Sequence, residues 1–102
     1  MATPTIPQTT ALQAQAAANL FINEHLPDRF VADQAHFAES DGRWHVPIVL
    51  AYPNIGTLGQ VGEVVIGEET AAIISHTPIA VIKEKATALY QTRRSDIEAT
   101  LS

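Results

Sequence analysis

The sequence lacks several residue types that would identify a function directly. The 102-residue chain has no cysteine, which excludes disulfide bonds, thiol nucleophiles, cysteine-based zinc sites and iron–sulfur clusters. It has six Lys and Arg residues against eleven Asp and Glu residues, and its formal net charge is −5. Nucleic-acid binding draws on clustered basic residues, so this balance argues against a nucleic-acid partner.

Long apolar segments and targeting signals are also missing. Apolar runs are short, such as residues 48–51, whereas a membrane-spanning helix needs about 20 apolar residues. Residues 1–8 have neither the basic nor the apolar region of a signal peptide, and their prolines are typical of a flexible arm. We therefore expect a cytoplasmic protein that makes no contact with a membrane.

The length and composition are those of one small domain. A chain of 102 residues that is 46% hydrophobic can bury a single core, without room for a second domain. We expect a flexible arm at residues 1–8, one domain at residues 9–94, and a C-terminal tail or short helix at residues 95–102.

A first helix is predicted to follow Thr9 or Thr10, either of which can cap its free N–H groups. Within it, an apolar stripe recurs every four residues and is expected to face the core, with two flanking residues that widen it: Leu12, Ala16, Leu20, Ala17 and Phe21. The helix should end near His25 because Pro27 cannot continue it.

Two strands joined by a turn are predicted next, at residues 29–39 and 43–52. In the second strand large apolar residues alternate with the others, as Trp44, Val46, Ile48, Leu50 and Tyr52. Asp41-Gly42 suits a tight two-residue hairpin turn. Such a turn would place Pro47 at a position where the strand ladder requires a backbone N–H, which proline lacks. We therefore expect a four-residue loop or a bulge.

The second half of the chain predicts a loop at residues 53–60, then strands at 61–66 and 71–76. A second helix should follow with Thr77 as its N-cap and Pro78 at its first position, and with Arg93 and Arg94 in its last turn. Its buried face is expected to contain Ile79, Ile82, Ala86, Leu89 and Tyr90. Residues 96–101 are expected to form either a short extra helix or an extension of this one.

This order of elements predicts an α+β fold. An N-terminal helix, a four-stranded antiparallel sheet of two hairpins and a C-terminal helix form a two-layer sandwich, with both helices on the face that carries Trp44.

The four histidines are the strongest candidates for chemistry in a chain without cysteine. His25 at a helix end suits the C-terminal dipole. His36 and His45 are expected in diagonal positions on neighbouring strands, on the face opposite Trp44, but two ligands without a third do not make a metal site. His76 precedes the second helix, at a junction where binding groups often collect. We predict possible binding roles for His36, His45, His76 and the loop residue Asn54, and no catalytic residue, metal site or cofactor.

Four of the six basic residues, Lys83, Lys85, Arg93 and Arg94, lie within twelve positions in the second half of the chain. They are either an ordinary solvated helix face or a contact patch for an acidic partner or nucleic acid.

Two groups of proteins resemble this sequence. Gly62-Glu63-Val64-Val65-Ile66 with Thr70 and Ile73, preceded by residues 41–46, is similar to the G-E-V-x-I-x-x-x-T-G-x-I pattern of PepSY-type domains. The chain departs from that pattern at Ala71, where the family usually has glycine. It also resembles short uncharacterised cyanobacterial proteins in residues 44–47, 62–64 and 76–78. The PepSY resemblance implies a small α+β domain, and neither resemblance implies an activity.

The leading functional hypothesis is a non-enzymatic interaction or regulatory domain that binds a protein partner or a second copy of itself. The expected surface is the sheet face of His45, Pro47, Val49 and Ala51, or a sheet edge. One alternative is a small-molecule binding module or weak enzyme with a pocket between helix and sheet near residues 53–60 and His76 at its rim. The other is an antitoxin-like regulator.

Overall fold

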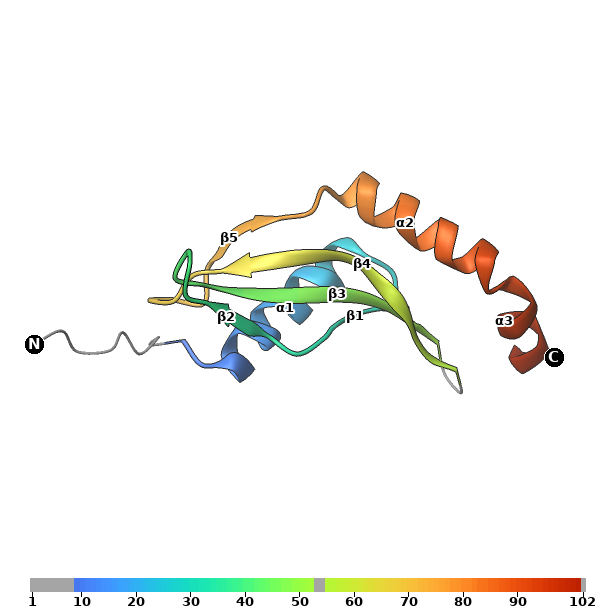
Figure 1. Ribbon diagram of the computed structural model, residues 1–102, viewed down its shortest axis with the longest axis horizontal. Coiled ribbons are helices and arrows are strands. Elements are labelled where there is room, and N and C mark those ends of the chain that lie inside the picture. The colour runs from blue at the N-terminus through green and yellow to red at the C-terminus, as the bar shows by residue number, and fades with distance from the viewer. Residues whose placement is uncertain (1–8, 53–54, 102) are drawn as a thin grey trace, which may run out of the picture.

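The computed structural model describes residues 9–52 and 55–101, which form an antiparallel sheet with helices before and after it (Figure 1). In chain order the elements are α1 (Ala11–His25), β1 (Phe30–Ala32), β2 (His36–Ala38), β3 (Arg43–Tyr52), β4 (Gly56–Ile66), β5 (Ile73–His76), α2 (Ile79–Thr92) and α3 (Arg94–Leu101).

Helix α1 begins and ends where local signals predict. The Thr10 hydroxyl accepts a hydrogen bond from the Gln13 N–H at 3.2 Å, and the Gln13 side chain accepts one from the Thr10 N–H at 2.9 Å. This reciprocal capping box satisfies two donors at the helix start. The helix ends at His25, two residues before Pro27.

The strand predicted at residues 29–39 is broken into β1 and β2, which both pair with β3. Ala32 lies opposite Ile48 and His36 lies opposite His45, so residues 33–35 face only two residues of β3. The Asp33 N–H donates to the Pro47 carbonyl at 2.9 Å, but Pro47 has no N–H to return. The missing donor explains why the regular ladder stops here.

The turn between β2 and β3 is looser than a two-residue hairpin. Ala38 pairs with Arg43, which leaves a four-residue loop at residues 39–42. Gly42 has a φ of 66°, and its N–H donates to the Ala38 carbonyl at 2.8 Å. The looser turn inferred from Pro47 is therefore confirmed.

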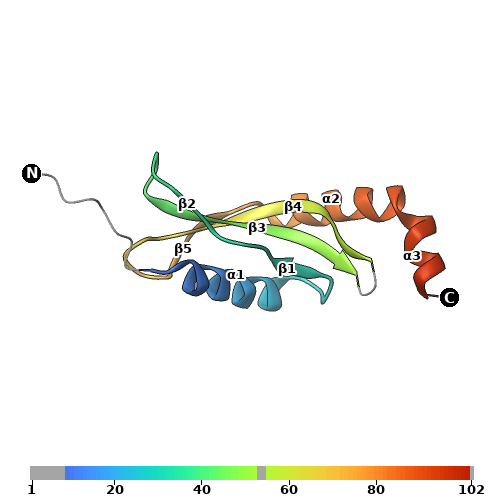
Figure 2. The same ribbon diagram turned by 60° about the horizontal axis from the view of Figure 1, so that its bottom comes forward.

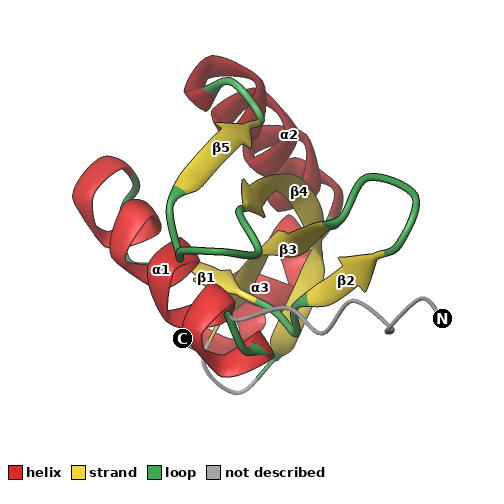
Figure 3. Cartoon of the chain, turned by 90° about the vertical axis from the view of Figure 1, so that its left-hand side faces the viewer, coloured by secondary structure: helices red, strands yellow, loops and turns green. Residues whose placement is uncertain are grey.

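Strand β4 contradicts most of the loop predicted at residues 53–60. It begins at Gly56 and stays paired with β3 through two register shifts, which leave Leu58 and Val61 as extra residues. Such bulges bend a strand and increase its twist, and the sheet is visibly curled (Figure 3).

Two glycines of β4, Gly59 from the predicted loop and Gly62 from the predicted strand, lie directly beneath α2. A Cβ atom at Gly62 would lie 2.9 Å from Ile82 Cγ1, and one at Gly59 would lie 3.1 Å from Leu89 Cδ1. Glycine in a strand often marks such a close approach. These glycines therefore allow α2 to pack close to the sheet.

The start of α2 also differs from the prediction. The N-cap is Pro78, without a side-chain hydrogen bond, and Thr77 does not cap the helix. The Thr77 hydroxyl instead accepts from the Glu63 N–H at 3.0 Å, while the Thr77 N–H donates to the Glu63 carbonyl at 3.0 Å. Thr77 thus holds the segment before α2 against β4.

The chain after α2 forms the short extra helix that was one of the two expectations for the tail. Helix α2 ends at Thr92, so Arg93 is its C-cap and Arg94 begins α3, and neither belongs to the last turn of α2. Ile97 of α3 is fully buried.

Both long helices pack on one face of the sheet. Figure 2 shows α1 alongside β1, and α2 leading into α3 at the C-terminal end of the molecule. Ile48 of β3 lies opposite Gly62 of β4, so both residues belong to the same face of the sheet. Ile82 of α2 lies over Gly62, and α1 packs against this face too. The core cluster on this face draws on both helices and the central strands, and its members with no exposed surface are Ala14, Ala18, Val46, Ile48, Val61, Val64, Ile66 and Ile82. The predicted α+β fold with an antiparallel sheet is confirmed.

Candidate functional site

The outer face of α1 is the most exposed apolar surface of the described residues. The sequence predicts that Leu12, Ala16 and Leu20 face the core, and the structure contradicts this. Leu12 is 79% exposed and Leu20 is 61% exposed, and Ala16 between them is also exposed. We call these three residues the α1 outer stripe.

The residues of α1 that do face the sheet form a second stripe with the same spacing. Ala14, Ala18 and Ile22 are displaced by two positions from the outer stripe, or about 200° around a helix. Two small alanines let the helix lie close to the sheet. Because both stripes repeat every four residues, periodicity alone does not distinguish the buried one.

The surroundings of the α1 outer stripe are uncharged over most of its length. Residues 11–23 contain no charged side chain. A hollow of about 470 Å³ lies beside Ala16, where α1 meets the loop between β4 and β5, and it is lined by Thr9, Gln13, Ala16, Glu69, Thr70 and Ala71. Ala16 belongs to both the stripe and the hollow, and the lining of the hollow adds one acidic residue, Glu69.

The sheet face proposed from the sequence offers less apolar surface. His45, Pro47 and Ala51 are half-buried, and Val49 is buried. Val31, which pairs with Val49 from β1, is 39% exposed. Helices α1 and α2 lie on the other face, so this face is open, and Val31 is the large exposed apolar side chain that the described residues of β1 to β4 place on it.

His45 and His36 are direct cross-strand partners rather than diagonal ones. The His45 Nε2 atom lies 2.8 Å from Asp41 Oδ2, and its Nδ1 atom lies 3.4 Å from Glu63 Oε1. A neutral imidazole has one N–H, so only the protonated ring can donate to both carboxylates. This contact engages both ring nitrogens and leaves neither as a free base.

The charges around His45 shift two pKa values. Burial alone would lower the pKa of His45, but the hydrogen bonds and negative charges of Asp41 and Glu63 together raise it above 6.5. The hydrogen bond from His45 is the main cause that lowers the pKa of Asp41 below 3.8. The described residues contain no group of three or more His, Asp or Glu side chains placed to hold a metal ion.

His76 and His25 both lie against Phe21 of α1. The His76 ring centroid is 4.5 Å from that of Phe21, and the His25 centroid is 4.7 Å from it. His76 Nδ1 also lies 2.9 Å from the Thr77 carbonyl. His76 thus packs on α1. Asn54, the other residue for which a binding role is predicted, lies outside the described residues.

The four basic residues do not form one patch. Lys83 and Lys85 are two positions apart on α2, about 200° around the helix. Arg94 Nε donates to Glu98 Oε1 at 2.9 Å within α3, and Arg93 is the C-cap of α2. Only Lys83 of the four lines a groove between α2 and the sheet.

The groove lies beside residues 53–60, near which a pocket is predicted, but none of its described lining residues belongs to that segment, so the predicted pocket stays a prediction. The groove has a volume of about 400 Å³ and lies between α2 and the turn that joins α1 to β1, over the end of β3. Its lining includes Tyr52, next to the segment where a pocket is predicted, but it does not include His76. Arg29, Tyr52 and Tyr90 could not be predicted as site residues, because they come from three distant segments of the sequence with no common spacing.

The chain matches no protein-family model, and no curated protein or solved structure matches it significantly. The resemblance to PepSY-type domains therefore stays a prediction. Among the described residues, no helix is sufficiently long and apolar to cross a membrane.

Proposed function

We propose that this chain is a non-enzymatic interaction domain that self-associates through the α1 outer stripe. The observation that carries the proposal is the exposure of Leu12 and Leu20, the two most exposed large apolar side chains in the described part of the chain. Contiguous exposed apolar side chains on a helix are typical of an interaction site.

A second copy of the chain fits the stripe because the stripe is symmetric about Ala16. A two-fold axis at Ala16 places Leu12 of one chain against Leu20 of the other, and the two small Ala16 side chains let the helices approach. Rows of residues spaced by four are also the ridges that interdigitate in the commonest helix packing. No charge is desolvated between residues 11 and 23.

The expected association is weak. Helix α1 has 15 residues, so it is about 22 Å long at 1.5 Å per residue. A helix face of this length offers a few hundred Å² per chain, below the roughly 800 Å² per partner of stable complexes. We therefore expect a dissociation constant in the micromolar range or weaker.

Sedimentation velocity over a range of protein concentrations tests the proposal. The wild type should show concentration-dependent dimerisation, and the double variant Leu12→Gln/Leu20→Gln should remain monomeric. Glutamine keeps a similar length and good helix propensity, so the variant should fold. The control Leu12→Met/Leu20→Met keeps the apolar stripe and should dimerise.

A third variant separates the helix face from the open sheet face. Val31→Gln removes the large exposed apolar side chain of that sheet face and should leave dimerisation unchanged. A wild type that stays monomeric up to millimolar concentration would contradict the proposal. So would a Val31→Gln variant that is monomeric while Leu12→Gln/Leu20→Gln still dimerises.

A further inference from the structure

The groove between α2 and the α1–β1 turn combines an apolar interior with cationic walls. Phe30 and Leu50 are buried side chains of β1 and β3 in its lining, and Ala86 of α2 is buried opposite them. Its volume of about 400 Å³ lies in the range of small-molecule sites, roughly 300–1,000 Å³.

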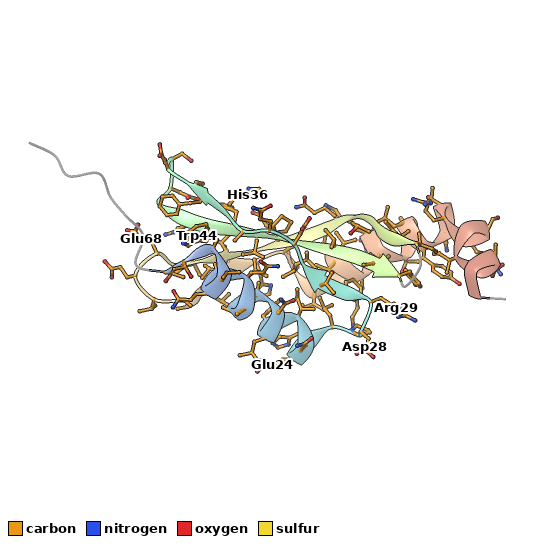
Figure 4. All side chains as sticks on the ribbon, turned by 90° about the horizontal axis from the view of Figure 1, so that it is seen from below. Glu24, Asp28, Arg29, His36, Trp44 and Glu68 are labelled. Carbon is orange, nitrogen blue, oxygen red and sulfur yellow. The ribbon has the colours of Figure 1, made fainter. Side chains whose placement is uncertain are left out.

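The charge of the groove is opposite to that of the whole chain. Among the described residues, its lining includes two basic residues, Arg29 and Lys83, and no acidic residue. Arg29 comes from the turn after α1 (Figure 4) and Lys83 comes from α2, so the two cations approach the groove from different elements. No carboxylate of the described residues forms an ion pair with either of them.

Aromatic side chains hold one of the two cations in place. The Arg29 guanidinium carbon lies 5.1 Å from the centroid of the Tyr52 ring, a distance at which a cation is attracted to the ring face. Tyr52 in turn lies 6.3 Å from Tyr90 of α2, measured between ring centroids. Stacking on a ring leaves the N–H groups at the edge of the guanidinium available to a carboxylate.

The lining favours binding over catalysis. Thr87 contributes an aliphatic hydroxyl to the groove, and this hydroxyl donates to the Lys83 carbonyl of the same helix at 2.9 Å. No histidine, aspartate or glutamate lines the groove to act as a base.

We propose that this groove binds a small organic carboxylate with an apolar body, whose carboxylate lies at Arg29 and Lys83 and whose body lies over Phe30, Leu50 and Ala86. Charge complementarity selects the anion, since an uncharged ligand of the same shape would gain nothing from the two cations. The site is separate from the α1 outer stripe, so this proposal does not depend on self-association.

The test uses two probes with the same phenylpropyl body, 4-phenylbutyrate with its carboxylate and 4-phenylbutanol with an uncharged hydroxymethyl group, titrated into the ¹⁵N-labelled full chain and followed by NMR. The carboxylate should shift the amide signals of residues 29–30, 50–52 and 83–90, and it should bind at least about fivefold more tightly than the alcohol. Failure of the carboxylate to shift these signals at millimolar concentration, or equal binding of the alcohol, would overturn the proposal.

Charge variants locate the anion. Arg29→Gln and Lys83→Gln should each weaken carboxylate binding, by about tenfold for Arg29, and should leave binding of the alcohol nearly unchanged. Lys85→Gln removes the same charge from the same helix outside the groove and should have little effect. A loss in Lys85→Gln equal to that in Lys83→Gln would show a general charge effect and contradict the assigned site.

A variant that fills the groove gives an independent check without any change of charge. Thr87→Leu adds apolar volume to the lining and replaces a β-branched residue with a better helix former, so the helix should persist. Both probes should then bind more weakly. The double variant Leu12→Gln/Leu20→Gln should bind 4-phenylbutyrate like the wild type, which keeps the outcome of this test separate from that of the self-association test.

Discussion

Helices α1 and α2 pack on the same face of the sheet, but the small residues at the two contacts come from different partners. At the contact of α1 the small residues are Ala14 and Ala18 of the helix itself, which have no exposed surface. At the contact of α2 they are Gly59 and Gly62 of strand β4, which lie beneath Leu89 and Ile82. Each contact thus joins a surface of small residues to a surface of larger ones.

This difference determines what remains outside each helix. Because alanines occupy the inner face of α1, Leu12 and Leu20 lie on its outer face. Helix α2 uses its large side chain Ile82 against the sheet, and its outer positions include Lys85. The outer face of α1 is therefore apolar, whereas that of α2 carries charge.

The largest expected effect separates the two faces of α1. Ile22→Ala removes a side chain that is 1% exposed and leaves a cavity, so we expect a loss of about 2–5 kcal/mol in the free energy of unfolding. Leu20→Ala should change it by less than about 0.5 kcal/mol at concentrations where the chain is monomeric. Urea unfolding measures both, and equal losses would contradict the assignment of the two faces.

The next effect concerns the contact of α2. A Cβ at Gly62 would lie 2.9 Å from Ile82 Cγ1, so Gly62→Ala should cost about 1–3 kcal/mol through overpacking. Gly59→Ala should cost less, because its nearest neighbour is the flexible end of Leu89.

A second substitution shows whether overpacking is the cause. Ile82→Ala removes the Cγ1 atom that lies nearest to a Cβ at position 62, so the loss of stability in Gly62→Ala/Ile82→Ala should be smaller than the sum of the two single losses. Strict additivity in chemical denaturation would refute a direct clash.

A smaller effect compares the two threonines before the helices. Thr10→Ala removes the N-cap of α1 and should cost about 1 kcal/mol, while Thr10→Ser should cost little because serine caps well. Thr77→Ala leaves the Glu63 N–H without its acceptor and should cost about 1 kcal/mol as well. Amide exchange distinguishes them, since the first variant should speed exchange in the first turn of α1 and the second should speed it at Glu63.

Features set by neighbours in the sequence could be predicted. The alternation of residues 43–52, the cap at Thr10 and the loop demanded by Pro47 all depend on local backbone chemistry, and the structure has each of them. The buried positions Ile82 and Ala86 of α2 follow from its periodicity in the same way.

Features set by tertiary contacts could not be predicted. Gly59 is typical of a loop in the sequence, and only the position of Leu89 shows that it belongs to a strand beneath a helix. The two stripes of α1 have equal spacing, so the choice between them depends on how closely the helix approaches the sheet. The groove brings together Arg29, Tyr52 and Lys83 from segments that no local pattern connects.

The smallest effect lies on the open sheet face, which neither long helix covers. The folded-state pKa of His45 is raised above 6.5, so its contribution to stability is present below pH 6.5 and is lost as the pH rises through the folded-state value. The pKa of Asp41 is lowered below 3.8, so its contribution is present above pH 3.8 and is lost as the pH falls through the folded-state value. The pair therefore stabilises the fold most between these limits.

Removing the Asp41 carboxylate tests its contact with His45, and the same pH titration shows whether this contact affects the packing of the two helices. Asp41→Asn should lower the NMR-measured pKa of His45 and reduce the loss of stability between pH 6 and pH 8, whereas Asp28→Asn makes the same charge change away from His45 and should do neither. The methyl signals of Ile22 and Ile82 should stay constant through the titration, because both lie on the covered face of the sheet. A pH-dependent shift of either methyl signal that Asp41→Asn abolishes would mean that the open face and the helix contacts are coupled.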